Sequence, residues 1–244
     1  MKNKKVFLPK SAVLIVLMVQ VFSSCTFAGS MGIKGSGKAI SEERQISNFT
    51  GLDVSGGFEV VLTQGNQQAL VIEADDNLMR EIITEVRGGE LNIYVRGSVS
   101  PVSKMKAYLT FVHLEDIDIS GAVRVNAEQK LSFEKLNIEG SGASKIEFSA
   151  EMQSLKADFS GASTVNISGN VNDLKIECSG ASKLYLSDLQ ASTAKLELSG
   201  ASYAEVNVSG NLRVDASGAS DVRYKGDPKD VTFDTSGASK VRKM

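Results

Sequence analysis

The chain has 244 residues and a formal net charge of −2, and it carries no Arg- or Lys-rich arm, so its charge gives no indication of a nucleic-acid partner. Aromatic residues make up 6% of the sequence, Trp is absent, Gly is frequent at 22 residues and Pro is rare at 3. This composition excludes a core built mainly from large aromatic side chains and favours a regular β architecture with many tight turns.

The N-terminus has the pattern of an export signal. Several lysines precede SAVLIVLMVQVF (11–22), an apolar stretch too short for a membrane span. The FSSC sequence that follows resembles a lipobox with Phe22 in place of the usual Leu, and the resemblance implies a bacterial lipoprotein whose Cys25 is diacylated and becomes the new N-terminus. Ordinary cleavage near Ala28 is the alternative. We expect a signal peptide over 1–24 and a flexible, Gly- and Ser-rich tether over 25–39.

Lipidation of Cys25 would anchor the protein in the cell envelope, and we expect it in the outer membrane. The TFAGS sequence after Cys25 lacks the acidic residues associated with surface export. This favours the periplasmic side without deciding between the two. Only Cys178 would then remain, so we expect no intramolecular disulfide.

The tripeptide Ser-Gly-Ala recurs seven times, and in six copies a second Ser follows it. Successive copies begin 21, 19, 19, 20, 18 and 19 residues apart, and a fixed period near twenty is typical of a solenoid. The first Ser of each copy is Ser120, Ser141, Ser160, Ser179, Ser199, Ser217 or Ser236.

Apolar residues occupy alternate positions on both sides of each turn, which predicts strands with one buried face. So short a repeat leaves no room for a helical crossover. We therefore predict an all-β domain over 40–244 that folds as a parallel β-helix. Its seven regular coils, over 113–244, would stack at about 4.8 Å into a prism roughly 34 Å long. Residues 40–112 are less regular, and GLDVSGGFEVVL (51–62) resembles a degenerate first copy of the repeat.

The two ends of this solenoid are predicted to differ. The segment NLMREIITEV (77–86) predicts a helix that caps the irregular end, with Asn77 as its N-cap and Leu78, Ile82 and Val86 at a spacing of four. At the other end the sequence KVRKM offers no cap. Its basic residues would blunt the free sheet edge, which is also a candidate site of self-association.

Three parts of the sequence resemble the head GIN domain family, a family of auto-transporter adhesins. They are ERQISNFTGLDVSGGFEVVLTQG (43–65), the segment ADDNLMREIITEV (74–86) with the following GGELNIYV, and the serial SGAS turns. The resemblance covers nearly everything after the tether. It implies a right-handed parallel β-helix on an exported protein, and it implies no catalytic residues.

The residue two positions before each turn is acidic in all seven copies. In a β-helix these carboxylates would form a column with neighbours about 5 Å apart, and they would repel one another unless neutralised. Basic residues two positions earlier in four copies favour a charge-compensated surface lattice. Calcium is an alternative, although one carboxylate per coil is a thin ligand set. Hydrogen bonds from the turns to the carboxylates are a third interpretation.

We take this column and the second Ser of each turn as a candidate interaction strip. The strip consists of Asp118, Glu139, Asp158, Glu177, Glu197, Asp215, Asp234, Ser144, Ser163, Ser182, Ser202, Ser220 and Ser239.

The serines do not predict a nucleophile, because SGAS is not a GxSxG elbow and the single histidine, His113, lies before the regular array. Cys178 occupies a position that is apolar in other copies, so we expect a buried small hydrophobe. We predict no catalytic residue, metal site or cofactor.

The leading hypothesis is a non-enzymatic, lipid-anchored envelope protein whose β-helix is an adhesion or presentation surface. Its partner would be a glycan, an envelope component or a second copy of the chain. A carbohydrate-active enzyme that uses the stacked carboxylates is one alternative, because glycoside hydrolysis needs only carboxyl groups. A calcium-dependent binding module is the other.

Overall fold

The structure is a computed structural model that describes residues 32–100 and 104–244, and this part of the chain contains seventeen β-strands and no helix. The predicted signal peptide and Cys25 lie outside the described residues. The strands are β1 (Ala39–Arg44), β2 (Gly51–Gly56), β3 (Glu59–Gln64), β4 (Ala69–Asp75), β5 (Ile82–Arg87), β6 (Glu90–Val95), β7 (Met105–Phe111), β8 (Asp116–Gly121), β9 (Arg124–Asn126), β10 (Leu131–Gly142), β11 (Lys145–Gly161), β12 (Thr164–Gly180), β13 (Lys183–Leu198), β14 (Tyr203–Ala216), β15 (Asp221–Lys225), β16 (Asp230–Thr235) and β17 (Lys240–Lys243).

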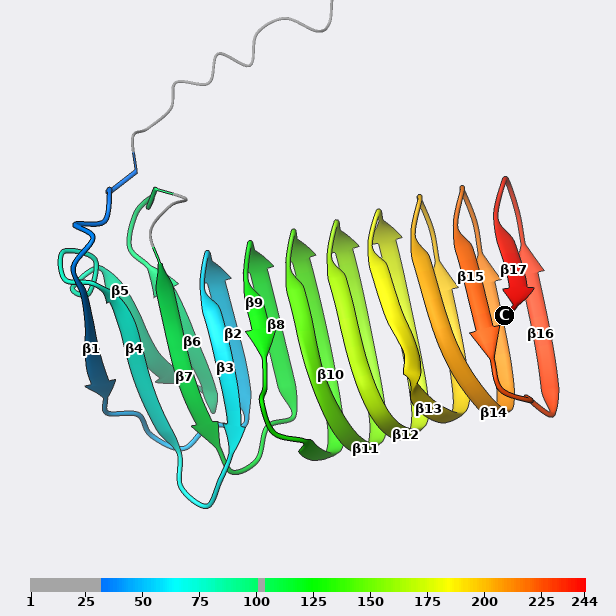
Figure 1. The fold of residues 1–244 in the computed structure, drawn as a ribbon, viewed down its shortest axis with the longest axis horizontal. Helices are drawn as coiled ribbons and strands as arrows, with labels where there is room; N and C mark the ends of the chain where they lie inside the picture. Colours follow the sequence, from blue (N-terminus) through cyan, green and yellow to red (C-terminus); the bar gives the residue numbers. More distant parts are fainter. Residues whose placement is uncertain (1–31, 101–103) are drawn as a thin grey trace, which may run out of the picture. The chain divides into compact units, whose positions relative to one another are not determined.

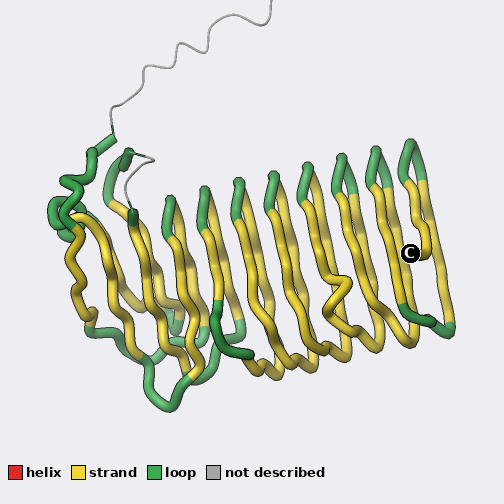
Figure 2. Tube along the Cα trace, in the orientation of Figure 1, coloured by secondary structure: helices red, strands yellow, loops and turns green. Residues whose placement is uncertain are grey.

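The strands form a β-solenoid of about seven turns, as predicted, with parallel pairing from coil to coil (Figure 1). Each Ser-Gly-Ala turn is a corner, and the corners lie in a row along one edge of the solenoid (Figure 2). We call the sheet formed by the strand segments that follow the corners sheet A, and the sheet formed by those that precede them sheet B. The strands β11 to β14 each run through both sheets, so each also forms the return between two corners.

Aliphatic side chains fill the space between the two sheets. The residues three positions before the corners are at most 2% exposed in six of the coils, which confirms the predicted inward face. Phe159 is fully buried and lies where a Cβ on Gly140, in the coil before, would come within 2.4 Å of its ring. Large and small residues therefore alternate along the stack, which allows a sequence with few aromatics to close its core.

Residues 51–62 form the first coil, which confirms the degenerate copy. Ser55 pairs with Ser120 and Gly56 with Gly121, so the Ser55–Gly57 corner stacks in register on the first regular corner. On its other side the first coil contacts β6 and β7.

The predicted helix over 77–86 is wrong. Residues 76–81 form turns, and β5 (Ile82–Arg87) pairs antiparallel with β6 along its whole length. The β-branched residues of IITEV favour a strand, and Gly88 and Gly89, with φ of 61° and 87°, allow the tight hairpin turn. Asn77 does not cap a helix: its side-chain amide donates to the Lys34 carbonyl and accepts from the Ser36 N–H, both at 2.9 Å.

Antiparallel strands take over the role of the expected helical cap. β4 pairs antiparallel with both β7 and β1, and this continues sheet A beyond the first coil. The bonds of Asn77 also hold part of the segment predicted to be a free tether, and Ile33 forms two backbone hydrogen bonds with Ser98 and Ser100. Residues 32–38 are therefore attached to the domain.

In the last coil, β16 and β17 each pair on one side only among the described residues. Val231 and Phe233, which correspond to buried positions in earlier coils, are 49% and 40% exposed. The basic residues predicted to blunt this edge form ion pairs, Arg242 with Asp221 at 2.7 Å and Lys243 with Asp227 at 2.8 Å.

Candidate ligand-binding surfaces

The corners are held by a continuous hydrogen-bond ladder. In each regular corner the Ala N–H donates to the Gly carbonyl of the corner before, as from Ala162 to Gly142 at 2.8 Å. Gly161 has a φ of 116°, and a Cβ there would lie 2.4 Å from the Gly142 oxygen. Glycine is therefore required for its backbone angle and for the close approach of the neighbouring corner. The repeated tripeptide is an architectural element.

The second Ser of the corner lies inside the solenoid and not on the predicted strip. Ser144, Ser163, Ser182, Ser202 and Ser220 are at most 3% exposed, and Ser239 is partly buried. Ser202 and Ser220 donate to the carbonyl of the first Ser of their own corner, at 3.2 and 3.0 Å. The corner Ala is exposed in every regular corner.

The acidic half of the predicted strip forms one column on the outer face of sheet B. The seven carboxylates pair in register from coil to coil, and Asp53 of the first coil extends the column by one residue. The structure thus brings together Asp118, Glu139, Asp158, Glu177, Glu197, Asp215 and Asp234. It separates them from the serines of the strip, because those face inward.

A cationic column lies beside the acidic one, at Lys156, Lys175, Lys195 and Arg213. In the middle of the array the two columns are bonded within each coil, Lys175 to Glu177 at 2.6 Å and Lys195 to Glu197 at 2.5 Å. The hydrogen bond and charge of Lys175 lower the pKa of Glu177. This part of the surface is the compensated lattice that the sequence favoured.

The first coils lack this compensation. Burial raises the pKa of Asp53, and burial together with the charge of Asp53 raises the pKa of Asp118. Glu90 on the neighbouring β6 has a raised pKa from burial and from the charges of Asp53, Asp118 and Asp116. Among residues 32–100 and 104–244, no three His, Cys, Asp or Glu side chains are grouped so that they could hold a metal ion.

His113 and Cys178 lie in different environments. His113 is exposed beside Leu114, and Cys178 is buried, with its thiol pKa raised to about 12 by burial. The buried position of Cys178 confirms its expected role as a core residue.

A groove of about 510 Å³ crosses several coils of sheet B next to the cationic column. Leu174, Ala194 and Leu212 lie beneath it and are at most 4% exposed. Its polar walls contain Ser154, Asp173, Lys175, Thr193, Lys195, Asn211, Arg213, Asp230 and Thr232. The sequence reasoning found the cationic residues of this groove but not the groove, because the depression depends on the packing of three neighbouring coils.

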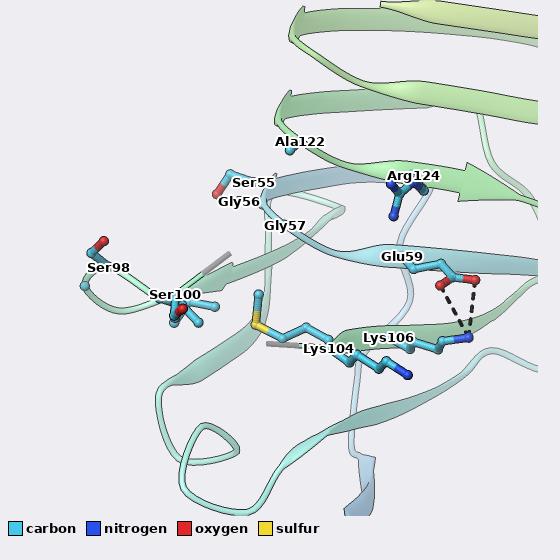
Figure 3. Close-up of a pocket in the computed structure, with 14 residues that line it drawn as sticks. Ser55, Gly56, Gly57, Glu59, Ser98, Ser100, Lys104, Lys106, Ala122 and Arg124 are labelled. Carbon is cyan, nitrogen blue, oxygen red and sulfur yellow. Dashed lines mark hydrogen bonds and ion pairs between the residues drawn. The ribbon is translucent and has the colours of Figure 1, made fainter. Parts of the chain in front are cut away.

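A larger cleft, of about 820 Å³, lies beside the corner of the first coil (Figure 3). It is lined by Ser55, Gly56 and Gly57 of that corner and by side chains from β3, β7, β9 and the segment after β6. Both carboxylate oxygens of Glu59 lie 3.3 Å from the Lys106 ammonium. The sequence feature that could have indicated this cleft is Gly57, because the seven regular corners have Ala at that position.

Sheet A also carries an aromatic patch that was not predicted from the sequence. The rings of Tyr185 and Tyr203, from adjacent coils, have centroids 5.9 Å apart, and the Arg223 guanidinium lies 5.4 Å from the Tyr203 centroid. Burial and a hydrogen bond to Glu205 raise the pKa of Tyr203 to about 12. The two tyrosines stand in neighbouring outward columns, so only the folded stack brings them together.

The chain belongs to the family described as "Putative auto-transporter adhesin, head GIN domain", whose model matches residues 48–228. This confirms the resemblance seen in the sequence. The sequence matches no functionally curated protein. The described residues contain no helix long and apolar enough to cross a membrane.

Several solved structures share the fold. A protein from Bacteroides fragilis described as a "putative adhesin" has a TM-score of 0.83 at 22% identity, over 87% of this chain and 100% of that one. A "putative adhesin" from Parabacteroides merdae has a TM-score of 0.69 at 18% identity, over 88% and 100%. A "putative lipid binding protein" from Parabacteroides distasonis has a TM-score of 0.68 at 19% identity, over 87% and 99%.

Proposed function

We propose that this protein is a non-enzymatic, adhesin-like scaffold of the cell envelope that binds an extended glycan in the groove of sheet B. The observation that carries the proposal is the groove itself, which is lined by charged and polar side chains and continues across several equivalent coils. The family and the named structural neighbours support an adhesin-like or binding role.

The groove suits a chain of sugar units for two reasons. The aliphatic parts of Lys175, Lys195 and Arg213, which line the groove, can pack against the apolar faces of sugar rings. Its walls repeat side chains with hydrogen-bonding groups from one coil to the next, and coils in a parallel sheet are about 4.8 Å apart. A polymer lying along the solenoid would therefore meet similar partners at each coil.

Binding is tested with a panel of polysaccharides and oligosaccharides, on the full chain and on the variant Lys175→Gln/Lys195→Gln/Arg213→Gln. We expect at least one glycan whose affinity falls at least tenfold in the variant. The matched control Lys145→Gln/Lys183→Gln/Lys240→Gln removes the same charge from sheet A and should bind normally. Equal binding by both variants would refute the groove as the site.

The same panel separates the proposal from its alternatives. Release of shorter sugars from any polysaccharide would identify a carbohydrate-active enzyme and overturn the non-enzymatic proposal. Binding that disappears with a calcium chelator and returns with calcium would favour the calcium-dependent module.

The lipid anchor and the envelope location belong to the same proposal. We expect radiolabelled palmitate to enter the wild-type chain and the Cys178→Ser variant, but not the Cys25→Ser variant. Protease treatment of intact and of permeabilised cells then reports which side of the outer membrane the domain faces. Absence of label from the wild-type chain would remove the anchor from the proposal.

A second proposal concerns self-association through the last coil. The exposed Val231 and Phe233 of β16 provide apolar contact area, and the acidic side chains of β16 complement the basic ones of β17. This complementarity favours β16 of one copy beside β17 of the other. Sedimentation velocity should show a concentration-dependent dimer that Val231→Lys/Phe233→Lys abolishes. A wild-type chain that remains monomeric at high concentration would refute it.

A further inference from the structure

The hydrogen-bond ladder along the corners has a direction. In each of the seven regular corners the Ala N–H donates to the Gly carbonyl of the corner before, at 2.7 or 2.8 Å. The donors are Ala122, Ala143, Ala162, Ala181, Ala201, Ala219 and Ala238. Every corner thus presents a backbone donor toward the N-terminal end of the solenoid and a backbone acceptor toward the C-terminal end.

The first corner uses only one of these two groups. The Gly56 carbonyl accepts from the Ala122 N–H at 2.7 Å, but the N–H of Gly57 has no acceptor within residues 32–100 and 104–244. β6 pairs with β2 only as far as Val54, and β7 pairs with β3 only from Glu59 onward. The corner between these two positions is therefore not covered by another strand of the described residues, and the cleft lies against it (Figure 3).

The cleft has an excess of positive charge. Lys104, Lys106 and Arg124 line it together with a single acidic side chain, Glu59. Glu59 is engaged by Lys106, whose pKa is raised by this hydrogen bond and charge. Lys104 and Arg124 form no ion pair within the described part of the chain, so two cationic groups are available to a ligand.

The remaining lining is suited to a small polar ring. Ser55, Ser98 and Ser100 provide hydroxyl groups, and Val99 and Met105 provide apolar surface. Among the described residues, a Cβ at Gly57 would meet only the Met105 methyl group, at 3.9 Å, so this side of the corner has room for a ligand.

We propose that this cleft binds the carboxylate of an acidic sugar, a uronic acid residue of a glycan. One carboxylate oxygen takes the place of the missing Gly carbonyl and accepts from the Gly57 N–H, and Lys104 and Arg124 balance its charge. The serine hydroxyls bind the sugar hydroxyls. The site lies at the first corner and is separate from the groove of sheet B, so it stands or falls independently of the proposed function.

The test follows the Gly57 amide of the full chain, in detergent, by nuclear magnetic resonance during titration with oligogalacturonate. We expect a saturable shift of this amide, and no shift with the neutral galactose oligomer of the same length. In the variant Lys104→Gln/Arg124→Gln the affinity should fall at least tenfold. The matched control Lys183→Gln/Arg223→Gln, on a distant part of sheet A, should retain it.

Three outcomes would overturn the proposal. Equal binding of the neutral oligomer would show that the cleft does not recognise the carboxylate. Inorganic phosphate that binds as tightly as the uronate would show a general anion site. An unchanged affinity in Lys104→Gln/Arg124→Gln would show that the cleft is not used. The variant Lys175→Gln/Lys195→Gln/Arg213→Gln should leave the Gly57 shift intact, and loss of the shift there would place the uronate in the groove of sheet B.

Discussion

The interior coils and the first coil use the same corner in different surroundings. At Gly161 the corner is stacked on both sides, and a Cβ would lie 2.4 Å from the neighbouring carbonyl oxygen. At Gly56, the matching position of the first coil, the corner is stacked on one side only, and a Cβ would meet no described atom within 4 Å. The charges differ in parallel, because Glu177 is bonded to Lys175 whereas Asp118 has Asp53 as its charged neighbour.

Stacking of equivalent coils uses the hydrogen-bonding groups and charges of the repeat to bind the neighbouring coils. Where a corner has neighbours on both sides, its Ala N–H and Gly C=O groups are bonded, and in two such coils the acidic residue is paired with a lysine, Glu177 with Lys175 and Glu197 with Lys195. Where the repeat is interrupted, the same groups remain available to a ligand. In a solenoid of near-equivalent coils, we therefore expect ligand binding at the coil that departs from the pattern.

The largest expected difference between the two regions is in their tolerance of a methyl group at the corner. Gly161→Ala should lower the free energy of unfolding by about 2 to 6 kcal/mol, because it combines a strained φ of 116° with a backbone clash. Gly56→Ala should lower it by only about 1 to 3 kcal/mol, because it has a strained φ of 107° but no backbone clash. Urea denaturation followed by circular dichroism measures both, and similar losses in the two variants would contradict the contrast.

A second prediction concerns how completely the interior coils exclude solvent. Burial raises the Cys178 pKa from 9.0 to about 12, so the reactive thiolate is about a thousandfold rarer than in an ordinary thiol at neutral pH. We expect the folded Cys25→Ser chain to react with a thiol reagent at least about a hundredfold more slowly than the same chain in urea. Rapid labelling under native conditions would show that the coils open locally.

The buried corner serines should differ among interior coils. Ser220→Ala removes a 3.0 Å hydrogen bond to the Ser217 carbonyl and should cost about 1 kcal/mol. Ser163→Ala removes a buried Oγ that forms no hydrogen bond with the described residues, so stability should be unchanged or slightly increased. Thermal unfolding of the two variants decides this, and an equal loss in both would assign the serines a common packing role.

The smallest predicted effects are opposite changes at the two parts of the acidic column. The lowered pKa of Glu177 means that its charge stabilises the fold above its ordinary pKa of 4.5, and that this contribution is lost as the pH falls through the folded-state value. Glu177→Gln should therefore lower the Tm at pH 7 by about 1 to 3 °C.

The raised pKa of Asp118 has the opposite consequence. The stability that the protonated Asp118 carboxyl group contributes is fully present below the ordinary pKa of 3.8 and is lost as the pH rises through the folded-state pKa. The charged form therefore opposes folding at neutral pH. Asp118→Asn should raise the Tm at pH 7 by about 1 to 3 °C. Each difference should shrink as the pH falls below the folded-state pKa of its carboxyl group, and shifts of the same sign in the two variants would contradict the comparison.

The sequence by itself determined the repeat, the strand directions and the inward and outward faces, because a coil of fixed length repeats its side-chain pattern in register. Ile117, Ile176 and Val214 are buried as predicted, and the acidic column is in register. The β5 strand was misread as a helix because Leu78, Ile82 and Val86 also fit a spacing of four, and only pairing with β6 decided between the two.

Only the tertiary structure decided what each corner group contacts. The second Ser of each corner looked like a surface residue in the sequence, yet stacking places it inside the solenoid. The groove of sheet B and the cleft at Gly57 depend on which coils are neighbours and on where pairing stops. Contacts between residues far apart in the chain are set by packing and by strand register, and a local pattern of residues carries no information about them.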